Sequence, residues 1–201
     1  KDALVADFTE VVVTASDSLL IGDATDSGNT KRDTVQGILD LVPAGITLGT
    51  PVVTTSGSSV DITGFPSGTK RITVMLNGVS TNGTSAIMIQ LGDAGGIEAS
   101  GYEGGSVNGS GSDSEYATAN GFSVGAVIIA ADTYHGVYTL NLFDATTFKW
   151  VETHSVAGDG SADMFDGGGD KSLTAELTQI RLTTIGGSNT FDAGKINIQY
   201  E

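Results

Sequence analysis

The sequence predicts a mainly β protein: an antiparallel β-sandwich of jelly-roll type with a small N-terminal αβ segment. Three observations lead to this class. Apolar and polar residues alternate with a period of two through much of the chain after residue 45. Glycine is frequent, with 29 residues, as expected for many tight turns between short strands. The helices that would connect parallel strands are missing from the pattern, which favours antiparallel sheets.

The stretch 70–93 carries the clearest strand pattern. The apolar positions of its two alternating runs are Ile72, Val74 and Leu76, followed by Ile87, Ile89 and Leu91. Between the runs lies Asn82-Gly83, the commonest dipeptide for a turn with positive φ at both central residues. The two runs are therefore predicted to pair as an antiparallel hairpin with a loose connection.

Residues 1–45 are predicted to form an attachment segment. Short strands are expected at 11–14, 19–21 and 31–33. Asp33 or Thr34 is placed to N-cap a helix that reaches Val42, and Pro43 and Gly45 stop it. The apolar residues expected to dock this segment on a partner are Val35, Ile38, Leu39, Leu41 and Val42.

Residues 46–201 are predicted to form the β-sandwich domain. Its strands are expected at 47–55, 57–63, 70–79, 85–93, 97–102, 122–130, 134–143, 148–156, 173–184 and 191–200. A hairpin turn is expected at 144–146, between two of the longest runs. The polar, glycine-rich stretches 103–120 and 157–170 are expected to be exposed loops.

Charge and composition narrow the function classes. The net charge is −15, so nucleic acid, whose phosphates attract basic patches, is an unexpected partner. No apolar run reaches the roughly 20 residues of a membrane-spanning helix, so membrane insertion is not expected. There is no cysteine, which excludes disulfides, a thiolate nucleophile and a cysteine zinc site.

Two groups of residues invite a metal-site interpretation. Four carboxylates within twelve residues could offer oxygen ligands to Ca²⁺, namely Asp159, Asp163, Asp166 and Asp170. Their spacing does not match an EF-hand loop, so a solvated acidic loop is the preferred interpretation and no cofactor is expected. His135 and His154 would come near each other at the open end of the predicted hairpin, although surface or intersubunit polar roles are favoured.

Aromatic residues offer a third candidate site. Phe148 and Trp150 are predicted to share one strand face, where aromatics are usually core or interface residues. Stacking on a sugar is the alternative, with Trp150, Tyr102 and Tyr116 as glycan contacts. No nucleophile elbow and no phosphate-binding glycine loop is present, so an enzyme is not expected.

Several segments resemble minor structural proteins of tailed bacteriophages, a group that includes tail-fibre, receptor-binding and head-decoration proteins. Residues 50–66, followed by Lys-Arg-Ile-Thr-Val at 70–74, are similar to a module of these proteins, and the ending 191–201 is similar to their C-termini. The strings 78–83 and 90–93, with Gly101-Tyr102, belong to the same pattern, and residues 20–40 resemble the short attachment unit that often precedes fibre domains.

The resemblance implies a virion structural protein on the exterior of the particle. It implies a short homotrimeric appendage, such as a capsid decoration, head fibre or tail spike, that docks through residues 1–45 on a major capsid or tail protein. An adhesin for a host-surface glycan is the alternative, and a polysaccharide-degrading enzyme is a distant one. No catalytic residue is carried over, because the resemblance is to structural proteins.

Overall fold

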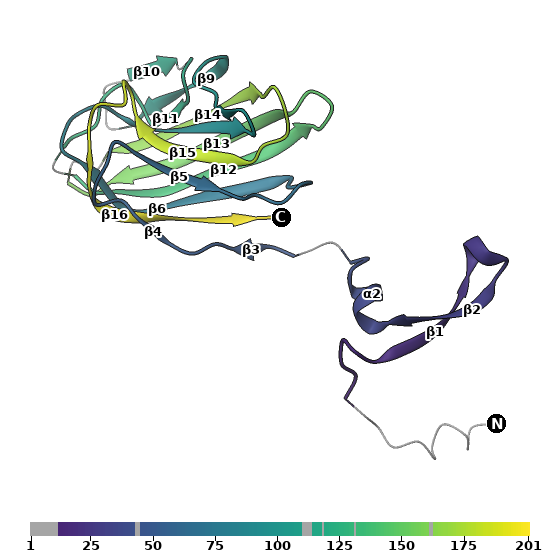
Figure 1. Cartoon of the computed structure of the whole chain (residues 1–201). Helices are drawn as coiled ribbons and strands as arrows, with labels where there is room; N and C mark the ends of the chain where they lie inside the picture. Colours follow the sequence, from purple (N-terminus) through teal and green to yellow (C-terminus); the bar gives the residue numbers. More distant parts are fainter. Residues whose placement is uncertain (1–11, 43–44, 110–113, 118, 131, 161–162) are drawn as a thin grey trace. The chain divides into compact units, whose positions relative to one another are not determined.

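The protein is described by a computed structural model that covers residues 12–42, 45–109, 114–117, 119–130, 132–160 and 163–201. The structure is mainly β, and all strand pairs are antiparallel, as the sequence predicts (Figure 1). The chain divides into two compact units, residues 1–45 and residues 46–201, which are described separately. No helix among the described residues is long and apolar enough to cross a membrane.

The N-terminal unit contains one hairpin and one short helix. Strand β1 (Ser18–Asp23) pairs with β2 (Asn29–Thr34) across the 3₁₀ turn η1 (Ala24–Asp26), and α2 (Val35–Leu39) follows. Thr34 is the N-cap, because its hydroxyl accepts a 3.0 Å hydrogen bond from the Gly37 amide. The helix ends at Leu39, earlier than predicted, and Val12–Thr14 form no strand; Val11 and Pro43 lie outside the described residues.

The body, residues 46–201, consists of two sheets that face each other. The order of the larger sheet is β10 (Ser114–Ala117), β9 (Tyr102–Asn108), β14 (Met164–Ser172), β13 (Lys149–Gly158), β12 (Tyr134–Asp144), β6 (Arg71–Thr81), β16 (Phe191–Tyr200) and β3 (Thr47–Leu48), with β4 (Val52–Val53) also on β16. The order of the smaller sheet is β11 (Phe122–Ser123), β7 (Ile87–Asp93), β15 (Gln179–Thr184) and β5 (Ser59–Thr63), with β8 (Gly96–Ile97) also on β7.

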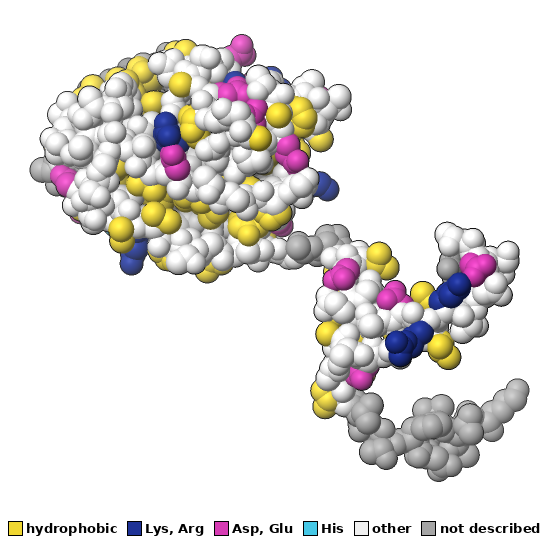
Figure 2. Space-filling view, viewed as in Figure 1, with side chains coloured by type: hydrophobic (Ala, Val, Ile, Leu, Met, Phe, Trp, Pro, Cys, Tyr) yellow, Lys and Arg dark blue, Asp and Glu magenta, His cyan; other side chains and the backbone are white. Residues whose placement is uncertain are grey.

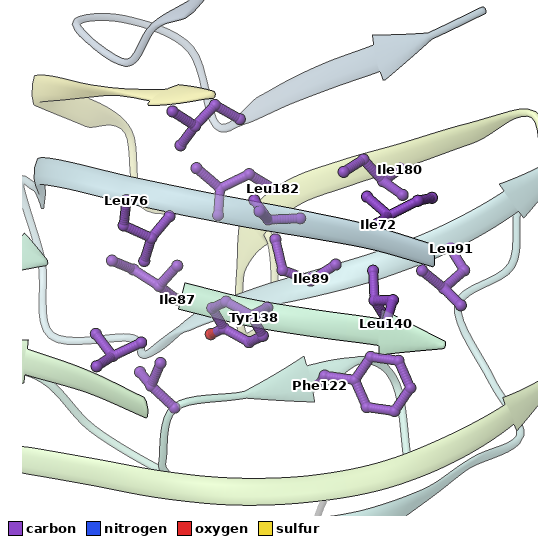
Figure 3. Packing of buried hydrophobic residues seen from close by; sticks show 14 of the residues in the cluster. Ile72, Leu76, Ile87, Ile89, Leu91, Phe122, Tyr138, Leu140, Ile180 and Leu182 are labelled. Carbon is purple, nitrogen blue, oxygen red and sulfur yellow. The ribbon is translucent and has the colours of Figure 1, made fainter. Parts of the chain in front are cut away.

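A single apolar core lies between the sheets (Figure 3). The larger sheet contributes side chains of β6 and β12, such as Ile72 and Leu140, and the smaller sheet contributes side chains of β7 and β15, such as Ile89 and Leu182. All four are at most 1% exposed, and burying such a side chain fully contributes about 1.5–3 kcal/mol. The alternating residues of the sequence pattern are thus the residues that hold the sandwich together.

The predicted hairpin over 70–93 is wrong, although both of its strands exist. Strand β6 pairs with β12 and β16 in the larger sheet, whereas β7 pairs with β11 and β15 in the smaller one. Neither Asn82 nor Gly83 has a positive φ. The Asn82 side-chain oxygen instead accepts a 2.9 Å hydrogen bond from the Thr190 amide, so this dipeptide anchors a connection between sheets.

The two predicted surface loops are also wrong in large part. The stretch 103–120 contains most of β9 and all of β10, and 157–170 contains most of β14. Glycines occur here because backbones approach closely: a Cβ at Gly104 would clash with the carbonyl oxygen of Gly168 on the neighbouring strand. The same glycine content that suggested loops therefore belongs to paired strands.

Other strand boundaries shift by smaller amounts. The stretch 47–55 is split into β3 and β4, 122–130 shortens to β11, and 173–184 shortens to β15. The predicted strand at 97–102 is divided between the end of β8 and the start of β9. The hairpin of β12 and β13 around residue 145 and the final strand β16 are confirmed.

Candidate functional site

Most apolar side chains described between residues 12 and 42 are exposed, and Figure 2 shows several of them on the surface of the N-terminal unit. Of the predicted docking residues, Val35 is half-buried and Ile38, Leu39, Leu41 and Val42 are exposed, Leu41 by 82%. The hairpin adds Leu19, Leu20 and Ile21, which were not predicted as docking residues although their run of three apolar residues is visible in the sequence. No residue from 12 to 42 with a described side chain is buried, so this part of the unit has no core of its own.

Two of the three predicted glycan contacts lie in the core of the body. Trp150 is 2% exposed and Tyr102 is 3% exposed, so neither ring offers a face on which a sugar could stack. The Tyr102 hydroxyl accepts a 2.6 Å hydrogen bond from the Leu91 amide and donates one of 2.9 Å to the Glu98 carbonyl. Trp150 has the core role that the sequence analysis favoured, and the burial of Tyr102 excludes the alternative of sugar contact for this residue.

Tyr116, the third predicted contact, lines a surface hollow. It is half-buried on β10, and the hollow has a volume of about 390 Å³. Asp166 and the glycines of β9 and β14 also line this hollow, as does Ser106. By the strand register the Tyr116 side chain lies on the face of Ser106 and Gly167, and the Asp166 side chain on the opposite face. The hollow therefore offers an aromatic side chain beside glycine backbone, which can bind a polar ring by stacking and backbone hydrogen bonds.

The four aspartates considered as weak calcium ligands do not lie on one acidic loop, because two of them belong to β14. Asp159 accepts hydrogen bonds from the Thr133 amide (2.9 Å) and hydroxyl (2.8 Å), which lower the pKa of its carboxyl. Asp166 and Asp170 lie four residues apart on β14, about 13 Å along an extended strand, and Asp170 pairs with Lys149 at 2.9 Å. The described residues, Asp163 included, contain no group of three or more acidic or histidine side chains that could hold a metal ion.

The two histidines are not brought together. In the β12–β13 hairpin, His154 lies opposite Tyr138, and His135 lies opposite Ala157, on the other face of the sheet. His135 is exposed and its Nδ1 accepts a 3.2 Å hydrogen bond from the Gly78 amide. His154 is buried, so the histidine metal site that was considered does not form.

His154 belongs to a buried polar row that the sequence analysis missed. Its Nδ1 lies 3.0 Å from Oε1 of Glu152, and its ring lies 4.8 Å from the ring of Tyr138. Burial raises the pKa of Glu152, opposed by the hydrogen bond with His154, and burial also raises the pKa of Tyr138. The signal was present in the sequence, because Glu152 and His154 follow the inward-facing Trp150 at intervals of two residues.

Ser106 lies in the same cross-strand row, separated from His154 by Gly167. Serine, histidine and glutamate in one row are the residue types of a hydrolytic triad. The geometry differs from a working one, because no hydrogen bond joins the Ser106 hydroxyl to His154 and this hydroxyl is buried away from solvent. We therefore assign this row to the interior of the sandwich and not to catalysis.

Comparisons of the chain with models of known protein families, with curated proteins and with solved structures find no match. The functional argument therefore rests on the residues and their geometry.

Proposed function

We propose that this chain is a structural protein of a tailed-bacteriophage virion. In this proposal it forms a short trimeric appendage on the exterior of the particle, attached through residues 1–45, with the body of residues 46–201 displayed outward. The observation that carries the proposal is the contrast between the two units. The body has its own extensive core, whereas residues 12–42 expose their apolar side chains and bury none that is described.

A segment of this kind gains little stability from its own contacts. Its helix spans five residues, and isolated helices much shorter than about 12 residues are marginal in water. Covering Leu20, Leu39 and Leu41, which are 76%, 50% and 82% exposed, would contribute free energy only when a partner is present. Such a unit suits attachment to a larger assembly such as a capsid or tail protein.

The trimer is proposed because the sheets of the body end in strands that can pair further. The larger sheet ends in β10 and β3, and the smaller sheet ends in β11 and β5. Unpaired strand edges are usually covered by neighbouring chain, and a symmetric homo-oligomer is the common way to do this.

Incorporation into particles tests the attachment. The double variant Leu39→Asp with Leu41→Asp places charge on the exposed apolar residues of the N-terminal unit. We expect purified phage particles that carry the variant to contain far fewer copies than wild-type particles, measured by quantitative mass spectrometry. The control Phe143→Asp changes an apolar residue of β12, a central strand of the body, that is 73% exposed and should incorporate normally. Normal incorporation of the double variant would refute attachment through this unit.

A second candidate, an adhesin for a host glycan, is favoured by the hollow at Tyr116. Binding to a glycan array should be lost in Tyr116→Ala and kept in Tyr200→Ala, a half-buried tyrosine whose ring packs edge-on against Phe65. A glycan signal that survives Tyr116→Ala would exclude this hollow as the binding site. Copy number separates the two candidates, because a decoration protein covers the particle and an adhesin is present in few copies.

A further inference from the structure

A second hollow of the body, with a volume of about 300 Å³, lies beside the turn between β12 and β13. Its apolar lining includes Leu142, Ala145, Phe148, Trp150 and Leu177. Two charged residues, Lys70 and Glu176, also line it. This volume is at the lower end of the range in which small molecules are bound, and an apolar lining with few polar groups is typical of such sites.

The backbone of Phe148 adjoins this hollow in a strained conformation. Its φ is 49°, in the left-handed region, which is unfavourable for a residue with a Cβ. A bulky aromatic residue is uncommon at such a φ, and strained residues of this kind cluster at functional sites. At the same position an Asn or Gly would relieve the strain but would remove the aromatic wall of the hollow.

The polar groups that line the hollow differ in whether they already have a hydrogen-bond or ion-pair partner. The carboxylate of Glu176 already accepts hydrogen bonds from the Gly68 amide at 2.6 Å and from the Ser67 hydroxyl at 3.0 Å. The indole nitrogen of Trp150 is buried without a hydrogen-bond partner among the described residues. Lys70 forms no ion pair with a described carboxylate. Lys70 is exposed whereas the indole nitrogen is out of contact with solvent, so Lys70 is the donor that a ligand in the hollow can reach.

We propose that this hollow binds a small amphipathic anion, an apolar ring that carries a carboxylate or a similar acceptor group. The ring would lie against Phe148, Leu142 and Leu177, and its anionic group would pair with the ammonium of Lys70. Attraction between these opposite charges beside an apolar wall is the physical source of the selectivity. The proposal does not depend on the virion proposal, because the residues involved are different.

Trp150 also supplies the reporter, because it is the only tryptophan of the chain. The ¹⁵N–¹H spectrum of the full chain thus has one indole signal, which can be followed during titration with 1-naphthoate. We expect a saturable shift of this signal. Glucuronate, an anion of polar surface, and 2-naphthalenemethanol, an uncharged analogue, should bind at least about tenfold more weakly, a difference of about 1.4 kcal/mol.

Matched variants decide whether the effect arises in this hollow. Ala145→Phe should fill it and abolish the naphthoate shift, whereas Ala117→Phe, an exposed alanine at the other hollow, should leave the shift unchanged. Lys70→Gln should weaken binding several-fold, and Lys195→Gln, another exposed lysine, should not. The remaining amide signals show whether each variant is folded. An unmoved indole signal, a shift that survives Ala145→Phe, or equal binding by Lys70→Gln would each overturn the proposal.

Discussion

At the scale of single residues, the packing of His154 on β13 requires a glycine at the facing position of β14. The imidazole of His154 lies against Gly167, where a Cβ would come within 2.5 Å of Cε1 and 2.6 Å of Nε2. The ring cannot move aside freely, because its other nitrogen lies 3.0 Å from the Glu152 carboxylate. Gly167 is therefore a packing requirement of this row.

Replacing this glycine should destabilise the body. We expect Gly167→Ala to lower the free energy of unfolding by about 1–3 kcal/mol, the range for overpacking a well-filled core. Urea unfolding followed by Trp150 fluorescence measures the change. Gly109→Ala is the matched control, because its Cβ would meet only Met164 atoms at 3.6 Å and beyond, an ordinary contact. Equal stability of the two variants would show that His154 adapts without cost.

Glu152 gives a prediction about pH. Burial raises the pKa of its carboxyl above the ordinary 4.5, so the folded state binds its proton more tightly than the unfolded state does. Lowering the pH from above the raised pKa towards 4.5 should therefore stabilise the wild type relative to Glu152→Gln, which has no proton to bind. Urea titrations of both proteins across this window measure the difference. A difference that is constant with pH, or that changes in the opposite direction, would contradict the raised pKa.

Whether a residue is buried was predictable where alternation is strict, and was not predictable where a polar residue faces inward. Ile72 and Ile89, two of the alternating apolar positions, lie in the core, whereas Glu152 was missed because a charged residue in a strand is normally an exposed one. The sequence around Tyr102 does not distinguish a surface position from a core position. Its burial depends on Phe122, which packs edge-on against it at 5.0 Å and comes from another strand.

At the scale of elements, a buried ion pair fastens β14 to the segment that follows β8. The Lys171 ammonium contacts the Glu98 carboxylate and also donates a 2.8 Å hydrogen bond to the Ser172 carbonyl. The side chain of Lys171 is only 6% exposed. By contrast, the pair of Lys149 and Asp170 on β13 and β14 is about one-third exposed at each side chain.

Breaking the buried pair should be costly. Lys171→Met leaves Glu98 partly buried without its cation, and we expect a loss of roughly 2–3 kcal/mol of unfolding free energy. Lys149→Met should change the free energy little, because water screens its exposed pair. Chemical denaturation of the two variants in parallel tests this, and equal losses would mean that burial does not distinguish the two pairs.

Strands were easier to predict than their partners. Alternation identified β6, β7, β12, β13 and β16, because it reflects which residues of a strand face the core. It carries no information on pairing, so β6 and β7 were joined in a hairpin although they belong to different sheets. Neighbours of β6 come from 55 or more positions further along the chain, and no local rule selects them.

At the scale of the whole molecule, the proposed trimer predicts a mass. Multi-angle light scattering of the full chain should give three times the 20.4 kDa of one chain at micromolar concentration. The physical reason is that association covers the exposed strand edges of the body. A single monomeric peak would remove the trimer from the proposal, whereas attachment through residues 1–45 would still be tested by incorporation into particles.

The position of β16 has a consequence for synthesis. This strand, residues 191–200, lies between β6 on one side and β3 and β4 on the other, so it joins segments that are translated far earlier. Strands β3, β4 and β6 leave the ribosome before β16. Their edges that pair with β16 therefore stay unpaired until residue 200 has emerged. We expect nascent chains stalled before residue 191 to be open to proteases, and chains extended well beyond residue 201 by a linker to be resistant.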